Sequence, residues 1–162
     1  MKIAVFVSGR GSNLNAILNS PDLKNLVEVI AVVSDKIDCK AFTIAKKFGI
    51  KTFTVGVGEG KINQNEITSV LNNLGVNFIV LAGYLKLIAY ELVEDFENRI
   101  ITIHPALLPS FGGKGMYGLN VHRAVFNSSA KVSGATVHFV DKNYDTGKII
   151  AQKCVDISYV KN

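Results

Sequence analysis

The chain has 162 residues, of which 48% are hydrophobic and 19% are charged, and its formal net charge is +5. This length suits one compact domain, expected over residues 1–162, and the balance of apolar and charged residues excludes a disordered chain. No apolar run reaches the roughly 20 residues of a membrane-spanning helix, and no signal-peptide pattern follows Met1, so a cytoplasmic protein is expected.

The first hundred residues alternate between strand-like and helix-like segments. Short apolar or β-branched runs predict strands at 2–7, 27–33, 51–55, 77–82 and 100–103. Helices are expected at 14–18, at 41–48 and around 67–74, where apolar residues recur at i, i+3, i+4 and i+7. Such alternation is typical of an α/β fold with an open, twisted, mostly parallel sheet and helices on both faces.

The pattern changes after residue 104. A loop with prolines and glycines, 104–115, precedes a helix expected at 119–127, and two strands are expected at 132–140 and 148–155. The connection of seven residues between those strands is too short for a helical crossover. The C-terminal strands should therefore be antiparallel.

A glycine-rich turn, Ser8-Gly9-Arg10-Gly11-Ser12-Asn13, lies where the first strand leads into a helix. Its glycines permit a close approach to a ligand, the helix N-terminus attracts an anion, and Ser12 or Asn13 can cap the helix. The alternatives are an ordinary β–α turn or a dinucleotide site with Asp35 as the ribose-binding acid. Because Leu14 replaces the third glycine of the dinucleotide fingerprint, a phosphate monoester is favoured.

The fifth strand ends at His104, where a site is expected because ligands of open α/β sheets bind at the carboxyl ends of the strands. Thr102 and His104 are two residues apart on an extended segment and should face the same side. Pro105 and Pro109 stiffen the loop that follows, and the bond between Leu108 and Pro109 is a candidate cis peptide.

The segment 134–147 places two acids around the turn between the last two strands. Asp141 is expected to make turn hydrogen bonds, whereas Asp145 is a candidate catalytic group. For His138, in the middle of a strand, a structural role is at least as plausible as a chemical one. The two cysteines lack the spacing of zinc ligands, so no metal site is expected.

Four segments together resemble the phosphoribosylglycinamide formyltransferase family, the folate-dependent enzymes of purine synthesis. Residues 8–14 look like the family's phosphate loop, and residues 80–86 look like its folate-contacting segment. His104-Pro-Ala-Leu-Leu-Pro109 and residues 134–147 look like the signature of formyl-folate transferases. The similarity runs in the same order from residue 1 to about 157, and it implies a Rossmann-like formyltransferase fold.

The resemblance implies transfer of a formyl group from 10-formyltetrahydrofolate to glycinamide ribonucleotide, with no metal. His104 would stabilise the tetrahedral oxyanion, and Asp145 would help to carry the proton of the attacking amine. By resemblance, the substrate phosphate is held by Gly11, Ser12 and Asn13. The residues expected to bind folate are Leu85, Lys86, Leu87, Ile88, Asp141, Lys142, Asn143 and Tyr144.

The chain departs from the family's usual pattern in three places. Family members usually carry Asn where this chain has Thr102, and a lost oxyanion donor can cost about 10²–10³ in rate. They also usually continue for several dozen residues with a further helix, which this domain is expected to lack. The arginine that family members often carry near the folate tail has no clear counterpart, although Lys61 is nearby in sequence.

Two alternatives to an active formyltransferase are kept. The departures at Thr102 and in the C-terminal segment would suit an impaired folate- or nucleotide-binding homologue, and turnover without the amine would instead favour a formyl-folate hydrolase. The positive charge suits an anionic small ligand, whereas the scattered lysines disfavour nucleic acid. Neither a nucleic acid nor a membrane is an expected partner, and a monomer or weak homodimer is expected.

Overall fold

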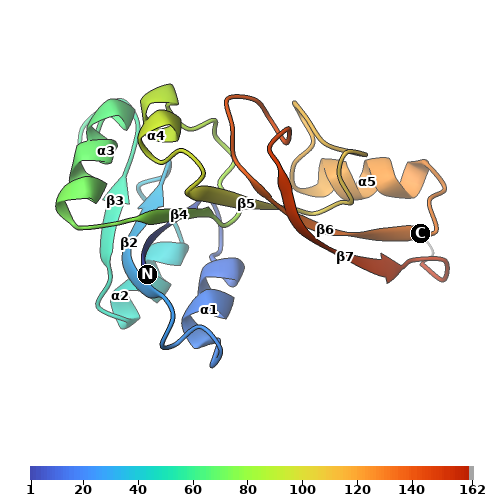
Figure 1. The fold of residues 1–162 in the computed structure, drawn as a ribbon, viewed down its shortest axis with the longest axis horizontal. Coiled ribbons are helices and arrows are strands. Elements are labelled where there is room, and N and C mark those ends of the chain that lie inside the picture. Colours follow the sequence, from blue (N-terminus) through green and yellow to red (C-terminus); the bar gives the residue numbers. More distant parts are fainter. Residues whose placement is uncertain (161–162) are drawn as a thin grey trace. The chain divides into compact units, whose positions relative to one another are not determined.

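The computed structural model describes residues 1–160, and the chain forms two compact units that divide after Ile100 (Figure 1). The expectation of a single domain over residues 1–162 stays a prediction. In chain order the elements are β1 Lys2–Val7, α1 Ser12–Asn19, β2 Glu28–Ser34, α2 Ala41–Lys47, β3 Lys51–Thr54, α3 Gln64–Asn73, β4 Phe78–Leu81, α4 Tyr90–Asp95, β5 Ile100–His104, α5 Leu119–Asn127, β6 Val132–Phe139 and β7 Ile149–Asp156.

The first unit contains a parallel sheet with the strand order β3-β2-β1-β4. The central strand β1 pairs with a neighbour on each side, since Val5 lies opposite Val32 of β2 and Val80 of β4. Helices α1 and α2 cover one face of this sheet, and α3 and α4 lie at the other (Figure 1). The expected parallel sheet with helices on both faces is confirmed.

The core of the first unit explains why β1 is apolar throughout. Ile3, Val5 and Val7 pack in one cluster with Leu14 of α1 and Ala41 of α2. The alternate residues, Ala4 and Phe6, are also buried, so β1 loses water on both faces. A central parallel strand therefore cannot alternate between apolar and polar residues.

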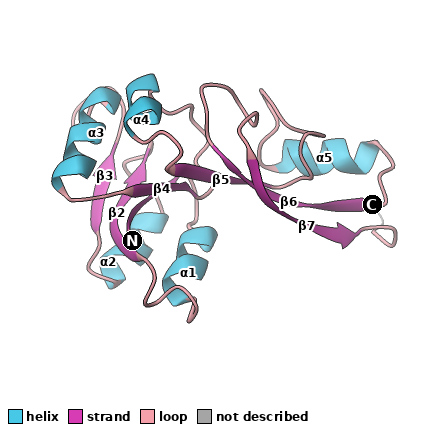
Figure 2. Ribbon diagram, viewed as in Figure 1, coloured by secondary structure: helices cyan, strands magenta, loops and turns pink. Residues whose placement is uncertain are grey.

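The second unit contains antiparallel strands in the order β5-β6-β7, together with α5 (Figure 2). In the first ladder Ile103 lies opposite Val137, and in the second Val137 lies opposite Ala151. The predicted antiparallel C-terminal strands are confirmed. At most of the ends of β6 and β7, the observed bound differs from the expected one by one residue.

Two features of the first unit differ from the expectation. Helix α4 was not predicted, because its six residues are too few for a helical period and no side chain caps its N-terminus. The prediction that Ser12 or Asn13 caps α1 is wrong: Gly11 occupies the N-cap position with φ 79°, and no side-chain cap is present. The left-handed conformation of Gly11 turns the chain, so α1 already begins at Ser12.

The structure predicts different effects of alanine at the two glycines of this turn. At Gly11 a Cβ would lie 2.7 Å from the Cβ of Ala41, and the positive φ disfavours any side chain. Gly11→Ala should lower the free energy of unfolding by about 2–4 kcal/mol, measured by urea denaturation. At Gly9 nothing lies within 4 Å of a Cβ, so Gly9→Ala is the matched control and should be neutral. Equal stability of the two variants would contradict this account.

Candidate active site

The sequence-predicted site residues fall in both units, and each group is described within its own unit. Residues 11–13 and 85–88 belong to the first unit. Thr102, His104 and the turn 141–145 belong to the second unit.

The ladder between β5 and β6 aligns polar side chains on one face. Thr102 lies opposite His138, and His104 lies opposite Thr136. Because directly opposed residues share a face, as do alternate residues of one strand, all four side chains project to the same side. His104, Thr136 and His138 are buried. Thr102 and His104 thus share a face, as expected.

The turn between β6 and β7 delivers the carboxylate of Asp145 to the two histidines. Its Oδ2 lies 3.5 Å from Nδ1 of His104, and its Oδ1 lies 3.6 Å from Nε2 of His138. The backbone N–H of Gly113 donates to Oδ2 at 2.9 Å. The predicted pairing of His104 with Asp145 is therefore present, and a second imidazole joins it. Asp145 itself has φ 56°, a left-handed conformation that Asp tolerates better than most residues.

Each imidazole also contacts a main-chain carbonyl. Nε2 of His104 lies 2.8 Å from the oxygen of Phe111, and Nδ1 of His138 lies 2.7 Å from the oxygen of Phe139. A carbonyl only accepts, so both nitrogens must donate. A neutral ring has one N–H, so its other nitrogen would present a lone pair to Asp145. A doubly protonated ring satisfies both contacts, and the geometry of His138 therefore favours its cationic form.

The shifted pKa values agree with this arrangement. Burial lowers the pKa of His138, but Asp145, the Phe139 carbonyl and the charge of Asp141 outweigh burial and raise it above 6.5. Burial raises the pKa of Asp145, but His138, the N–H of Gly113 and the charge of His104 outweigh burial and hold it below 3.8. Asp145 is thus kept ionised beside the ring of His138, whose affinity for a proton it raises.

Buried hydrogen bonds fix the loop that follows His104. The hydroxyl of Thr136 donates to the carbonyl of Ala106 at 2.7 Å and accepts from the N–H of Leu108 at 3.0 Å. The Gln152 amide donates to Thr136 and to the carbonyl of Leu108. The peptide bond between Leu108 and Pro109 is cis, as predicted. Thr136 and Gln152 were not predicted as site residues, although the register of the two predicted antiparallel strands would have placed them opposite each other.

The glycine-rich turn of the first unit leaves the N-terminus of α1 accessible. Ser12 and Asn13 are exposed, whereas Gly11 is buried against α2. The hydroxyl of Ser8 accepts from the N–H of Leu85 at 3.0 Å, and the N–H of Ser8 donates to the carbonyl of Gly83. This turn is therefore tied directly to the segment that begins at residue 83.

The residues expected to bind folate differ in accessibility. Leu85 and Leu87 are about half exposed, at 47% and 48%, whereas Ile88 is buried and contributes to the core. In the turn 141–144, Asp141 accepts from the N–H of Asn143 and from the hydroxyl of Thr146. The turn-forming role predicted for Asp141 is confirmed. Lys142, Asn143 and Tyr144 are exposed.

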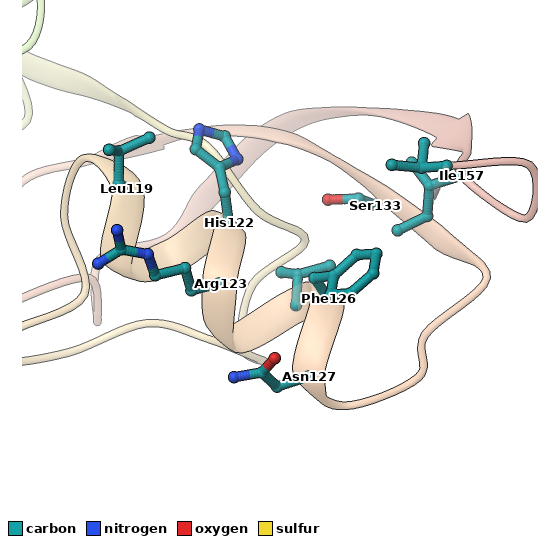
Figure 3. A pocket seen from close by; sticks show the side chains of 9 residues that line it. Leu119, His122, Arg123, Phe126, Asn127, Ser133 and Ile157 are labelled. Carbon is teal, nitrogen blue, oxygen red and sulfur yellow. The ribbon is translucent and has the colours of Figure 1, made fainter. Parts of the chain in front are cut away.

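A separate cavity of about 390 Å³ lies beside α5 in the second unit. Leu119, His122, Arg123 and Phe126 line it from the helix, and Ser133 and Ile157 line it from the neighbouring segments (Figure 3). None of the predicted site residues contributes to it, so it is not part of the candidate active site.

Residues 1–160 contain neither a metal-binding cluster nor a membrane-spanning helix. No cluster of three or more His, Cys, Asp or Glu side chains in this range is arranged to hold a metal ion. In the same range no helix has the length and apolar character needed to cross a membrane.

Comparison with known proteins identifies the family. The formyl transferase family matches residues 1–161. The chain is 46% identical to the chloroplastic phosphoribosylglycinamide formyltransferase of Arabidopsis thaliana, over 96% of this chain and 55% of that relative. It is 39% identical to phosphoribosylglycinamide formyltransferase of Bacillus subtilis, over 96% of this chain and 80% of that one. A crystal structure of phosphoribosylglycinamide formyltransferase from Bacillus halodurans matches with a TM-score of 0.85 at 33% identity, over 100% of this chain and 83% of that one.

The chain spans about half the length of the plant relatives that it matches. Because the family match covers nearly all of its residues, the chain belongs to the formyl transferase family. The resemblance indicated by the sequence motifs is confirmed.

Replacing Asp145 by Asn should lower stability mainly between about pH 4 and pH 6.5. The pKa of Asp145 is lowered by folding, so its contribution is lost as pH falls through the folded-state value. The pKa of His138 is raised, so its contribution is lost as pH rises through its folded-state value. We expect a difference of about 0.5–1 kcal/mol at pH 5.5 after solvent screening, measured by urea unfolding.

Asparagine tolerates the left-handed backbone of residue 145, so Asp145→Asn isolates the charge. Asp38→Asn, which removes an exposed carboxylate from the first unit, is the matched control. A stability difference for Asp145→Asn that stays constant from pH 4 to pH 9 would show that charge is not the cause.

Proposed function

We propose that this formyl transferase moves the formyl group of 10-formyltetrahydrofolate to the amine of glycinamide ribonucleotide, in purine synthesis. The observation that carries the proposal is the buried His104 ring 3.5 Å from the Asp145 carboxylate, at the end of β5. The printed names of the relatives, phosphoribosylglycinamide formyltransferase, support the choice of acceptor.

The reaction needs a proton acceptor and a group that stabilises negative charge. The acceptor amine attacks the formyl carbon, the carbonyl becomes a tetrahedral oxyanion, and the folate nitrogen leaves with a proton. In the proposed mechanism the His104 imidazolium stabilises the oxyanion, and Asp145 helps to carry the proton from the amine towards the leaving nitrogen. The Asp145 carboxylate is ionised at neutral pH, so it can accept a proton in this role. The mechanism assigns no step to a metal ion.

We assign the substrate phosphate to Gly11, Ser12 and Asn13. The first N–H groups of a helix have no partner within the helix, and the helix dipole favours an anion at this end. The exposure of Ser12 and Asn13 supports the assignment. The net charge of +5 also suits a substrate with a phosphate and a donor with a carboxylate tail.

We assign the folate to residues 85–88 and 141–144. The exposed apolar side chains of Leu85 and Leu87 suit an aromatic ring system, and Lys86 suits a carboxylate. Ile88 supports this segment from the core.

A cytoplasmic location, a monomer or weak homodimer, and the lack of a nucleic-acid partner stay predictions. Three plant relatives are named chloroplastic.

The assay for the function follows the absorbance change when the formyl folate loses its formyl group, with and without glycinamide ribonucleotide. Turnover should require the amine, and Asp145→Asn should lower kcat/KM by about 10²–10⁴. Asp38→Asn should leave kcat/KM unchanged. Folate deformylation without the amine would instead identify a hydrolase, and no turnover by the folded chain would refute the proposal.

Thr102 offers a second test, because the family usually has Asn at this position. Asn extends an N–H donor further than a threonine hydroxyl reaches, so Thr102→Asn should raise kcat, by up to about 10². The Kd for folate should change little, because the added hydrogen bond strengthens only as charge develops on oxygen. Thr102→Val controls for loss of the hydroxyl. A flat or lower kcat for Thr102→Asn would mean that threonine is not a defect at this site.

A further inference from the structure

His138 is a buried histidine that the proposed mechanism does not use. Its side chain is 2% exposed, and it lies on β6 directly opposite Thr102. Its Nε2 faces Oδ1 of Asp145 at 3.6 Å, within reach of an ion pair but longer than a normal hydrogen bond. Among the described residues, this nitrogen has no hydrogen-bond partner. A buried polar atom without a hydrogen bond calls for an explanation.

A purely structural role does not account for this contact. Nδ1 of His138 already donates to the Phe139 carbonyl at 2.7 Å, which anchors the ring to its own strand. The remaining nitrogen points at the carboxylate, where only a protonated ring is favourable. Burying a cationic ring is costly unless an anion compensates it, and Asp145 is that anion.

The turn between β6 and β7 holds Asp145 tightly against His138. A Cβ at Gly147 would overlap the carbonyl of Phe139 and would lie 3.5 Å from Nδ1 of His138, so only glycine fits there. On the other side, the Cβ of Asp145 lies close to Gly112, and Gly113 donates to Oδ2. The carboxylate is thus held through both oxygens: Oδ1 faces His138, and Oδ2 faces Gly113 and His104.

We infer that His138 is a positioning residue for the proposed formyl transfer: it holds Oδ1 of Asp145 and thereby directs Oδ2 towards His104. This inference rests on the proposed function of His104 and Asp145. His138 acts through Asp145 and does not touch the reacting atoms. Its protonated ring also keeps the carboxylate ionised, and this contribution is consistent with the lowered pKa of Asp145.

The pH dependence follows from the groups around the carboxylate. These groups are His104 from β5, His138 from β6 and the N–H of Gly113 from the loop after β5, while the charge of Asp141 in the turn acts on His138. Without His138, Asp145 loses a cationic neighbour but keeps the other contacts. Its pKa should rise, so the acid limb of the pH–rate profile should move to higher pH.

The experiment compares His138→Asn and His138→Gln with the unaltered chain. Asn retains a donor near Nδ1 but does not reach Asp145, whereas Gln places an amide N–H near the position of Nε2. We expect His138→Asn to lower kcat about ten- to a hundredfold with little change in KM, and to shift the acid limb upward. His138→Gln should recover part of kcat, because it restores the contact without the charge.

A second measurement does not depend on activity: the carboxyl carbon of Asp145 is titrated by NMR in each protein. His122→Asn is the matched control, because it removes an exposed histidine of α5 in the same unit. It should alter neither the Asp145 titration nor the rate. If His138→Asn does not fold, His138→Gln serves as the second variant, because glutamine keeps a polar side chain of similar length.

The outcomes separate this inference from the proposed function. If a folded His138 variant leaves both the Asp145 titration and the acid limb unchanged, the inference is overturned, even if the rate falls. If the unaltered chain transfers no formyl group but the Asp145 titration still shifts in His138→Asn, the proposed function is overturned. The positioning of Asp145 by His138 is then supported.

Discussion

The carboxylate of Asp145 is the constraint on which the candidate active site depends. A partly buried anion must be compensated, and here the compensation comes from two imidazoles and one backbone N–H, contributed by β5, β6 and the loop after β5. Each partner is fixed by a different part of the fold. The contacts therefore require the register between β5 and β6, the tight turn before β7 and the path of the loop to be correct together.

Hydrogen-bonded side chains of β6 and β7 support this site. Thr136 and Gln152 share their hydrogen bonds with the backbone of the loop 105–109, so the loop is held by directional contacts as well as by apolar packing. A buried network of this kind is stabilising when each donor and acceptor is paired, and it specifies one loop conformation. Nε2 of His138, which is buried without a hydrogen-bond partner among the described residues, faces the carboxylate at 3.6 Å.

The first unit solves a different physical problem. In the proposed function it presents backbone N–H groups of α1 to an anion, and the left-handed turn at Gly11, packed against Ala41, leaves no side chain in the way. Both faces of β1 are buried, which fixes the position of the turn at its carboxyl end. A rigid apolar strand thus carries a polar turn. This combination is typical of ligand sites in α/β proteins.

Local sequence determined the strands, the class of the sheet and the identity of the main candidate residues, because hydrophobic period and turn chemistry act over a few neighbouring positions. Residues 2–7, the turn at Gly11, His104 and the cis bond before Pro109 were recognised in this way, whereas the role expected for Asp145 came from the family resemblance. Helix α4 was not, since six residues carry too little periodicity. Only the tertiary structure indicates the role that we propose for His138, whose sequence neighbours fit a structural residue equally well. The role proposed for His138 depends on its contact with Asp145, which lies seven positions along the chain and across a turn. A contact of that kind depends on backbone angles that no local pattern encodes.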